Sequence, residues 1–222
     1  MKSKLILTGA TGMVGEGVLQ ECLKSNEIEK VLVINRKECG IIHPKLIEII
    51  HNDFFDISPL GDQLKYYDAC LFCLGISSVG ISEQNFYHLT YNLTLDFAKT
   101  LSVFNPQMVF CYISGQGTDS SEKGKIMWAR VKGKTENDLT KLAFKNVYNF
   151  RPGYLQPGKE MKNTKKYYKY ISWLYPLFKL IMPNYVSTLK ELAQAMINAI
   201  LIGYDKNILE VKDIIKLSNT NK

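Results

Sequence analysis

The sequence contains no uninterrupted apolar run of about 18 residues, the length that a membrane-spanning helix needs. It also has no apolar leader before its first predicted strand, because Lys2 and Lys4 lead directly into that strand. Neither a membrane-spanning protein nor an exported one is expected from these two absences. They predict a cytosolic protein.

Cysteine and histidine are scarce, with five and three residues in 222. Cys70 and Cys73 form a C-x-x-C pair, but they lie inside an apolar run where positions i and i+3 of a strand point to opposite faces. There is no second cysteine pair to complete a zinc site, and His88 has no other ligand-type residues around it. We therefore expect packing cysteines, no disulfide framework and no metal.

The length suits one doubly wound domain over residues 1–222, and an apolar content of 46% is enough for a full core. Charge is unevenly distributed along the chain. Residues 1–122 hold 9 basic and 14 acidic residues, whereas residues 123–222 hold 19 and 7. The basic character belongs to the second half, where substrate recognition would lie in such a fold.

Glycine is concentrated where the chain first turns. A short apolar strand, Leu5 to Leu7, is followed by Gly9, Gly12 and Gly15, and an apolar helical pattern begins near Met13. Glycines in this setting give a tight turn, close approach of backbone N–H groups to a pyrophosphate, and close packing of helix on strand. The alternative is a merely structural turn. The strand before it and the helix after it favour a dinucleotide site.

The rest of the chain alternates strands and helices, which predicts an α/β fold with a doubly wound parallel sheet of Rossmann type in the order 3-2-1-4-5-6. The further strands are expected at residues 31–34, 46–50, 69–74, 108–113 and 146–150. Helices are expected at residues 82–104, with Ser82 as N-cap, at 126–136 and at 190–202, before a closing segment at 208–217.

The second strand lacks the acidic residue that NAD-preferring folds place at its end to bind the ribose 2′-hydroxyl. The chain has Arg36 and Lys37 there instead, and a guanidinium pairs well with a 2′-phosphate. The alternative is a solvated basic turn. We expect NADP(H) to be preferred over NAD(H).

The string from Thr8 to Gly15, TGATGMVG, resembles the extended and atypical short-chain dehydrogenase/reductases, which include NAD-dependent epimerase/dehydratase-like proteins. The phrase Cys73-Leu74-Gly75 narrows the resemblance to the Tat-interacting-protein oxidoreductase-like group. This resemblance covers nearly the whole chain, and its cofactor-binding half is the more specific one.

The resemblance implies roles for individual residues. Asp53 and Phe54 would contact adenine, Ser114 would orient the substrate, and Lys132 would hold the nicotinamide ribose and lower the pKa of a catalytic tyrosine. The complete expected cofactor set is Thr8, Gly9, Ala10, Thr11, Gly12, Met13, Val14, Gly15, Arg36, Lys37, Asp53, Phe54, Leu74, Gly75, Ile76, Lys132, Pro152 and Gly153.

That tyrosine is missing. Relatives have Tyr-x-x-x-Lys, and the position four residues before Lys132 is Trp128, whose indole does not titrate usefully and cannot act as a general acid. Tyr154, just after the Arg-Pro-Gly of residues 151–153, is the nearest spare phenol on sequence grounds, followed by Tyr87 and Tyr91. The expected catalytic set is Ser114, Lys132, Trp128 and Tyr154.

Residues 154–187 are expected to form a small C-terminal lid or substrate lobe. Their lysine-rich and tyrosine-rich part, residues 159–182, could instead contact an anionic membrane or a partner protein. Nucleic acid is not expected, because the chain contains no recognised nucleic-acid module.

Two functions are carried forward. The first is an NADP(H)-binding oxidoreductase or epimerase-like enzyme that acts on a small carbonyl or sugar-like substrate. The rival is a catalytically impaired cofactor-binding regulator or scaffold. Neither the substrate nor the oligomeric state follows from the sequence.

Overall fold

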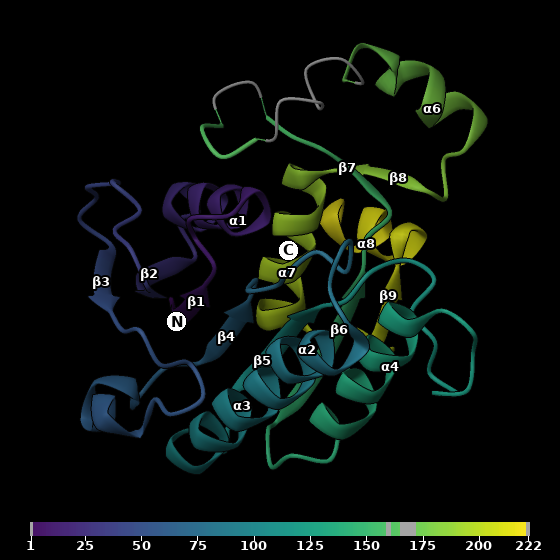
Figure 1. Ribbon diagram of the computed structural model, residues 1–222. Helices are drawn as coiled ribbons and strands as arrows, with labels where there is room; N and C mark the ends of the chain where they lie inside the picture. Colours follow the sequence, from purple (N-terminus) through teal and green to yellow (C-terminus); the bar gives the residue numbers. More distant parts are fainter. Residues whose placement is uncertain (1, 159–160, 165–171, 221–222) are drawn as a thin grey trace.

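A parallel sheet of seven strands forms the centre of the structure, a computed structural model that describes residues 2–158, 161–164 and 172–220 (Figure 1). The strand order is β3-β2-β1-β4-β5-β6-β9. The strands are β1 (Ser3–Thr8), β2 (Ile28–Asn35), β3 (Leu46–Ile50), β4 (Ala69–Phe72), β5 (Val109–Ile113), β6 (Asn146–Arg151) and β9 (Ile208–Glu210). The predicted doubly wound sheet and its order are confirmed, and β9 extends the sheet beyond β6.

Each pair of neighbouring strands in this sheet is parallel. The central strands are buried on both faces, as their continuous apolar runs predict. Because β1 pairs with both β2 and β4, the loops that follow these three strands meet at one edge of the sheet. This reversal of strand order is where doubly wound folds bind ligands.

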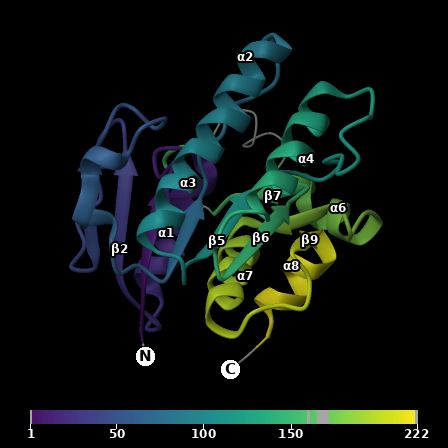
Figure 2. The ribbon, with the colours of Figure 1, turned by 90° about the horizontal axis from the view of Figure 1, so that it is seen from below.

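Helices cover both faces of the sheet (Figures 1 and 2). The helices are α1 (Met13–Lys24), α2 (Glu83–Tyr87), α3 (Leu93–Phe104), α4 (Met127–Leu139), α6 (Tyr175–Ile181), α7 (Leu189–Ile202) and α8 (Val211–Ser218). One core lies under α1, α7 and α8, and the other lies under α3 and the end of α4. Cys70 belongs to the second core and Cys73 packs against the first, so the two cysteines do lie on opposite faces.

The long helix predicted from Ser82 is one continuous helical segment with a change of pitch. Ser82 caps it by accepting a hydrogen bond from the N–H of Asn85, and the π-helical turn η2 (His88–Asn92) separates α2 from α3. The described part of the chain also contains the short 3₁₀ helices η1 (Ser58–Leu64) and η3 (Ser172–Leu174). Among the described residues, no helix is long and apolar enough to cross a bilayer.

The segment predicted as a lobe begins and ends in a second small sheet, in which β7 (Tyr154–Gln156) pairs in parallel with β8 (Val186–Thr188). Figure 1 shows α6 beyond this pair, away from the main sheet. Large apolar side chains are exposed on α6 and on the residues next to its two ends, namely Trp173, Leu177, Leu180, Ile181 and Met182. Much of the lysine-rich stretch at 159–182 lies outside the described residues, so its proposed contact with a membrane or partner stays a prediction.

A hydrogen bond to Asp138 links α4 to the π-helical turn η2. The Asp138 carboxylate accepts hydrogen bonds from the Tyr91 hydroxyl at 2.7 Å, from Lys134 at 3.0 Å and from Lys141 at 2.6 Å. Burial raises the pKa of Asp138, but the hydrogen bonds from Lys141, Tyr91 and Lys134 outweigh it and hold the pKa well below its usual range.

We predict that Asp138→Asn lowers the free energy of unfolding at pH 7 by about 1–3 kcal/mol, because charged hydrogen bonds are lost. A carboxyl with a depressed folded pKa stabilises above its unfolded pKa of about 3.9, and this stability disappears as the pH falls through the folded value. Urea unfolding curves of wild type and variant should therefore approach each other progressively as the pH falls below about 4.

Asp96→Asn provides the matched control, because Asp96 forms an exposed pair with Lys99 at 3.4 Å. Its effect should stay below about 1 kcal/mol. Equal losses for the two variants would contradict the structural role assigned to Asp138.

Candidate functional site

Three adjoining cavities follow the edge of the sheet where the strands end. The arginine cavity, of about 540 Å³, is lined by Gly9, Thr11, Asn35, Arg36, Lys37, Asn52, Phe54 and Leu74. The apolar cavity is lined by Arg36, Asn52, Phe54, Phe55, Leu74, Gly75, Ile76, Leu89 and Leu93. The lysine cavity, of about 360 Å³, is lined by Gly12, Met13, Val14, Cys73, Leu74, Gly75, Ile76, Ile113, Ser114, Lys132, Pro152, Gly153 and Leu155.

These cavities form one continuous groove, because each shares walls with the next. Arg36 and Phe54 line both of the first two cavities, and Gly75 and Ile76 line both of the last two. Leu74 lines all three. The volumes of the two end cavities fall within the range of small-molecule sites.

The glycine loop lies at the middle of this groove and depends on close backbone packing. Gly9 has a φ of +73°, and a Cβ at Gly15 would overlap the carbonyl oxygen of Gly9. Thr8, Ala10 and Gly15 are buried beneath the groove and are not among its lining residues. They hold the turn in place rather than line the cavities.

Gly12 leaves room for a ligand. A Cβ at Gly12 would meet only the Gly9 carbonyl oxygen, at 3.4 Å, and would otherwise occupy cavity space. Gly12 is also the N-cap of α1 and supplies no side-chain cap, although the first N–H groups of a helix have no intrahelical partner. This combination of space, N–H groups and helix dipole fits a pyrophosphate.

The predicted adenosine end is placed only in part as expected. Arg36 and Lys37 are exposed and line the arginine cavity, and Phe54 is buried there against Phe97. Asp53 is not among the lining residues, because its carboxylate turns back to accept a hydrogen bond from the N–H of Phe55 at 2.9 Å. Its neighbour Asn52 lines the cavity instead, which sequence reasoning missed.

At the other end, Ser114 and Lys132 are brought together. The Lys132 Nζ atom donates to the carbonyl oxygen of Ser114 at 2.5 Å, and both residues line the lysine cavity. Burial lowers the pKa of Lys132 to about 8, although the negative charge of Glu136 opposes this shift.

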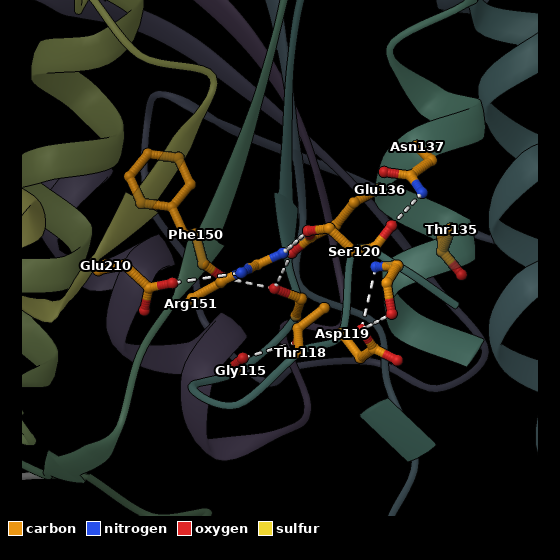
Figure 3. A network of polar contacts seen from close by, with 12 residues as sticks. Gly115, Thr118, Asp119, Ser120, Thr135, Glu136, Asn137, Phe150, Arg151 and Glu210 are labelled. Carbon is orange, nitrogen blue, oxygen red and sulfur yellow. Dashed lines mark hydrogen bonds and ion pairs between the residues drawn. The ribbon is translucent and has the colours of Figure 1, made fainter. Parts of the chain in front are cut away.

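Glu136 lies in a network of polar contacts next to this cavity (Figure 3). Its carboxylate is buried, accepts the Ser114 hydroxyl proton at 2.5 Å, and binds Arg151 through Nε at 3.0 Å and Nη2 at 2.5 Å. Arg151 also contacts Glu210 at the end of β9 and the hydroxyl of Ser120. The sequence pattern contained Glu136 and Arg151, but gave no signal that they bind each other.

The two other expected catalytic residues do not line the lysine cavity. The Trp128 indole lies against the turn of Gly115 to Gly117, about 3.6 Å from where a Cβ of Gly117 would be. Tyr154 lies on β7, donates its hydroxyl proton to Gln156 and packs edge-on against Phe178 in the lobe. Tyr154 as the spare proton donor therefore stays a prediction, which its hydrogen bond to Gln156 and its absence from the cavity lining do not favour.

Tyr91 is a poor substitute for the missing tyrosine. Burial and the hydrogen bond to Asp138 raise its pKa above the usual range, and its hydroxyl proton is directed to that carboxylate.

Within the described ranges, no cluster of three His, Cys, Asp or Glu residues could hold a metal ion.

Another residue missed from the sequence is Glu16, in the first turn of α1. It is buried, and its carboxylate accepts hydrogen bonds from the backbone N–H groups of Lys162 at 2.8 Å and Asn163 at 2.7 Å. This contact fastens part of the lobe segment to the helix that begins at the glycine loop.

Comparison with known proteins gives sequence relatives of low identity. The FMP52 protein of Meyerozyma guilliermondii is 24% identical over 71% of this chain and 67% of its own length. The FMP52 protein of Candida albicans is 25% identical over 96% of this chain and 97% of its own length. Protein HTATIP2 of Rattus norvegicus is 27% identical over 69% of this chain and 63% of its own length. No protein-family model matches the chain.

Alignment with some relatives is partial. The match spans 64% of the FMP52 protein of Candida glabrata and 51% of the leucinostatins biosynthesis cluster protein T of Purpureocillium lilacinum. The FMP52 relatives are named as mitochondrial proteins. The prediction of a cytosolic protein, made from missing segments alone, is contradicted by these names and is therefore wrong.

Solved structures share the fold across nearly the whole chain. A short-chain dehydrogenase from Burkholderia cenocepacia in complex with NADP has a TM-score of 0.67 and 14% identity, and the match covers 97% of this chain and 92% of the other. The Bordetella bronchiseptica enzyme WbmF in complex with NAD⁺ has a TM-score of 0.66 and 13% identity, with 98% and 76% covered. One neighbour is bound to NADP and the other to NAD⁺, so the shared fold does not decide the cofactor.

The sequence resemblance is thus confirmed at the level of fold and relatives. The chain shares its Rossmann fold with a short-chain dehydrogenase and with the enzyme WbmF, and it is similar in sequence to the FMP52 and HTATIP2 proteins.

Proposed function

We propose that the chain is an NADP(H)-dependent oxidoreductase or epimerase-like enzyme that acts on a small carbonyl or sugar-like substrate. The observation that carries the proposal is the continuous groove, which joins a cationic end at Arg36, the glycine loop at its middle, and Ser114 with Lys132 at the far end.

The residues of the groove fit the dinucleotide in chemical type. Arg36 and Lys37 would bind the 2′-phosphate, the Gly12 turn and the α1 N-terminus the pyrophosphate, and Lys132 the nicotinamide ribose. When bound, the cofactor supplies or accepts a hydride. The chain itself would position the substrate near Ser114 and place Lys132 beside the substrate's oxygen.

Residues 154–187 are proposed as the substrate lobe, within a single domain of residues 1–222. The first residues of this segment lie close to the lysine cavity, because β7 follows directly after Pro152 and Gly153, which line that cavity. The side chain of Gln116, two residues after Ser114, also donates to the carbonyl oxygen of Asn184 in the lobe at 3.3 Å. Both connections support a lobe that bears on the substrate end of the groove.

The regulator or scaffold alternative is favoured by one observation, the tryptophan at the tyrosine position. It predicts NADPH binding without turnover on any of a broad panel of aldehydes, ketones and nucleotide sugars. Turnover of even one substrate at a rate above the background of a Gly12 variant would contradict it.

We predict that NADPH binds more tightly than NADH, and that Arg36→Asp narrows or reverses this preference by tenfold or more, because a carboxylate repels the 2′-phosphate. Titration calorimetry with both cofactors measures the ratio. Lys212→Asp, which makes the same charge change on the exposed face of α8, should leave the ratio unchanged. Equal wild-type affinities for the two cofactors would refute the preference.

We also predict that Gly12→Ala weakens NADPH binding at least tenfold while costing at most about 1 kcal/mol of stability, since alanine is only a poorer N-cap at this position. Gly15→Ala should instead lower the stability itself, because its Cβ would overlap the Gly9 carbonyl. Thermal unfolding without ligand, followed by calorimetry, separates the two. Unchanged NADPH affinity in Gly12→Ala would exclude this turn as the pyrophosphate site.

A further inference from the structure

The lysine cavity offers few protons to a bound substrate. Ser114 has a single hydroxyl proton, and the Glu136 carboxylate, 2.5 Å away, takes it in preference to the Phe150 carbonyl oxygen at 3.2 Å. Arg151 donates hydrogen bonds to both oxygens of the Glu136 carboxylate, so this carboxylate is the acceptor in its contact with Ser114. Ser114 therefore presents a lone pair to the cavity rather than a proton.

None of the candidate tyrosines, Tyr154, Tyr87 and Tyr91, is among the residues that line the lysine cavity, nor is Trp128. Tyr154 and Tyr91 donate to Gln156 and Asp138, and Trp128 packs on the turn after Ser114. Cys73 lines the cavity, but burial raises the pKa of its thiol well above the usual range. Among the residues that line this cavity, Lys132 alone carries an ionisable N–H group.

We propose that Lys132 itself donates the proton to the substrate oxygen, while Glu136 holds Ser114 as a hydrogen-bond acceptor for the alcohol that forms. This inference rests on the proposed reductase function. It assigns to the lysine the step for which the family uses a tyrosine, and it gives Glu136 a positioning role.

The reaction balances with the reduced dinucleotide as the reductant. The substrate carbonyl carbon gains a hydride, with its two electrons, from the dihydronicotinamide, and the carbonyl oxygen gains a proton from the Lys132 ammonium. The products are an alcohol, the oxidised dinucleotide and a neutral lysine, which regains its proton from solvent. The new hydroxyl can then donate its hydrogen bond to Ser114 Oγ.

The surroundings of Lys132 suit this role. Burial lowers its pKa to about 8, and the nearest opposing charge is Glu136, one turn further along α4, which is itself neutralised by Arg151 from β6. Cys73, at the end of β4, is the other titratable group of the cavity and stays uncharged. A donor must be protonated, so reduction should decline as the pH rises through about 8.

The first test needs no cofactor. Competitive labelling of the ligand-free protein with acetic anhydride, followed by peptide mass spectrometry, gives the pH midpoint of reactivity for each lysine. Lys132 should have a midpoint near pH 8, well below the value of about 10.4 that a lysine has in a model peptide. A Lys132 midpoint of 10 or above would overturn the proposal.

The second test compares Lys132→Arg with the control Lys125→Arg. Arginine keeps the positive charge and the hydrogen-bond donors but does not release a proton, so kcat should fall by about 10²–10⁴ while the calorimetric Kd for NADPH stays within about threefold. The decline of wild-type kcat above pH 8 should disappear in the residual rate of the variant. Lys125→Arg should retain the wild-type rate and pH profile.

The outcomes separate the two proposals. A wild-type protein that fails to bind NADPH, or that turns over no substrate of the panel, would overturn the proposed function itself. Wild-type turnover that Lys132→Arg retains to within threefold, with the same pH profile, would overturn only the role of Lys132. Should Lys132→Arg fail to fold, the labelling midpoint of the wild type still decides the question.

Discussion

The hydrogen bonds and ion pair of the buried Glu136 carboxylate are the interactions on which the arrangement around the lysine cavity depends. They join α4 to β5 through Ser114 and to β6 through Arg151, and Arg151 extends the network to β9 through Glu210. A buried ion pair adds little net stability over an apolar pair, yet removing one partner typically costs about 3–5 kcal/mol because a charge is left uncompensated. The network therefore fixes geometry more than it adds stability, and the position of Ser114 follows from it.

The opposite constraint applies at the glycine loop, where packing rather than charge sets the geometry. Gly15 lies so close to the Gly9 carbonyl that no side chain fits between β1 and α1. The start of α1 is thereby held at the middle of the groove, between the arginine and lysine cavities. The groove thus has two different parts. Its middle is formed by close-packed backbone at the glycine loop, and the lysine cavity at its end contains ionisable side chains whose chemistry depends on their neighbours.

The lobe is linked to this groove at two separate points. Glu16 on α1 binds backbone N–H groups at Lys162 and Asn163, and Gln116 after β5 binds the carbonyl oxygen of Asn184. Both links use a side chain from the Rossmann core and the backbone of the lobe, so they depend little on the lobe's own side chains. The lobe also exposes large apolar side chains, among them Trp173 and Leu180, which take no part in either link.

The sequence by itself determined the strand, turn and helix of the cofactor loop, the order of the first six strands and the cationic residues after β2. The loop and the cationic residues are local features, since they depend on apolar periodicity and on the small size of glycine, whereas the strand order was inferred from the doubly wound fold that they predict. Only the structure showed that Asp53 turns back to Phe55, that Tyr154 turns toward the lobe, and that the Ser114 hydroxyl donates its hydrogen bond to Glu136. It also decided the role of Glu16, whose partner Asn163 is 147 residues away. The contacts of Glu136 and Glu16 join residues that are distant in the chain, and only the folded structure brings these partners within reach. Asp53 and Tyr154 instead bind residues two positions away, and the sequence pattern did not show that their side chains take these local partners rather than line the groove.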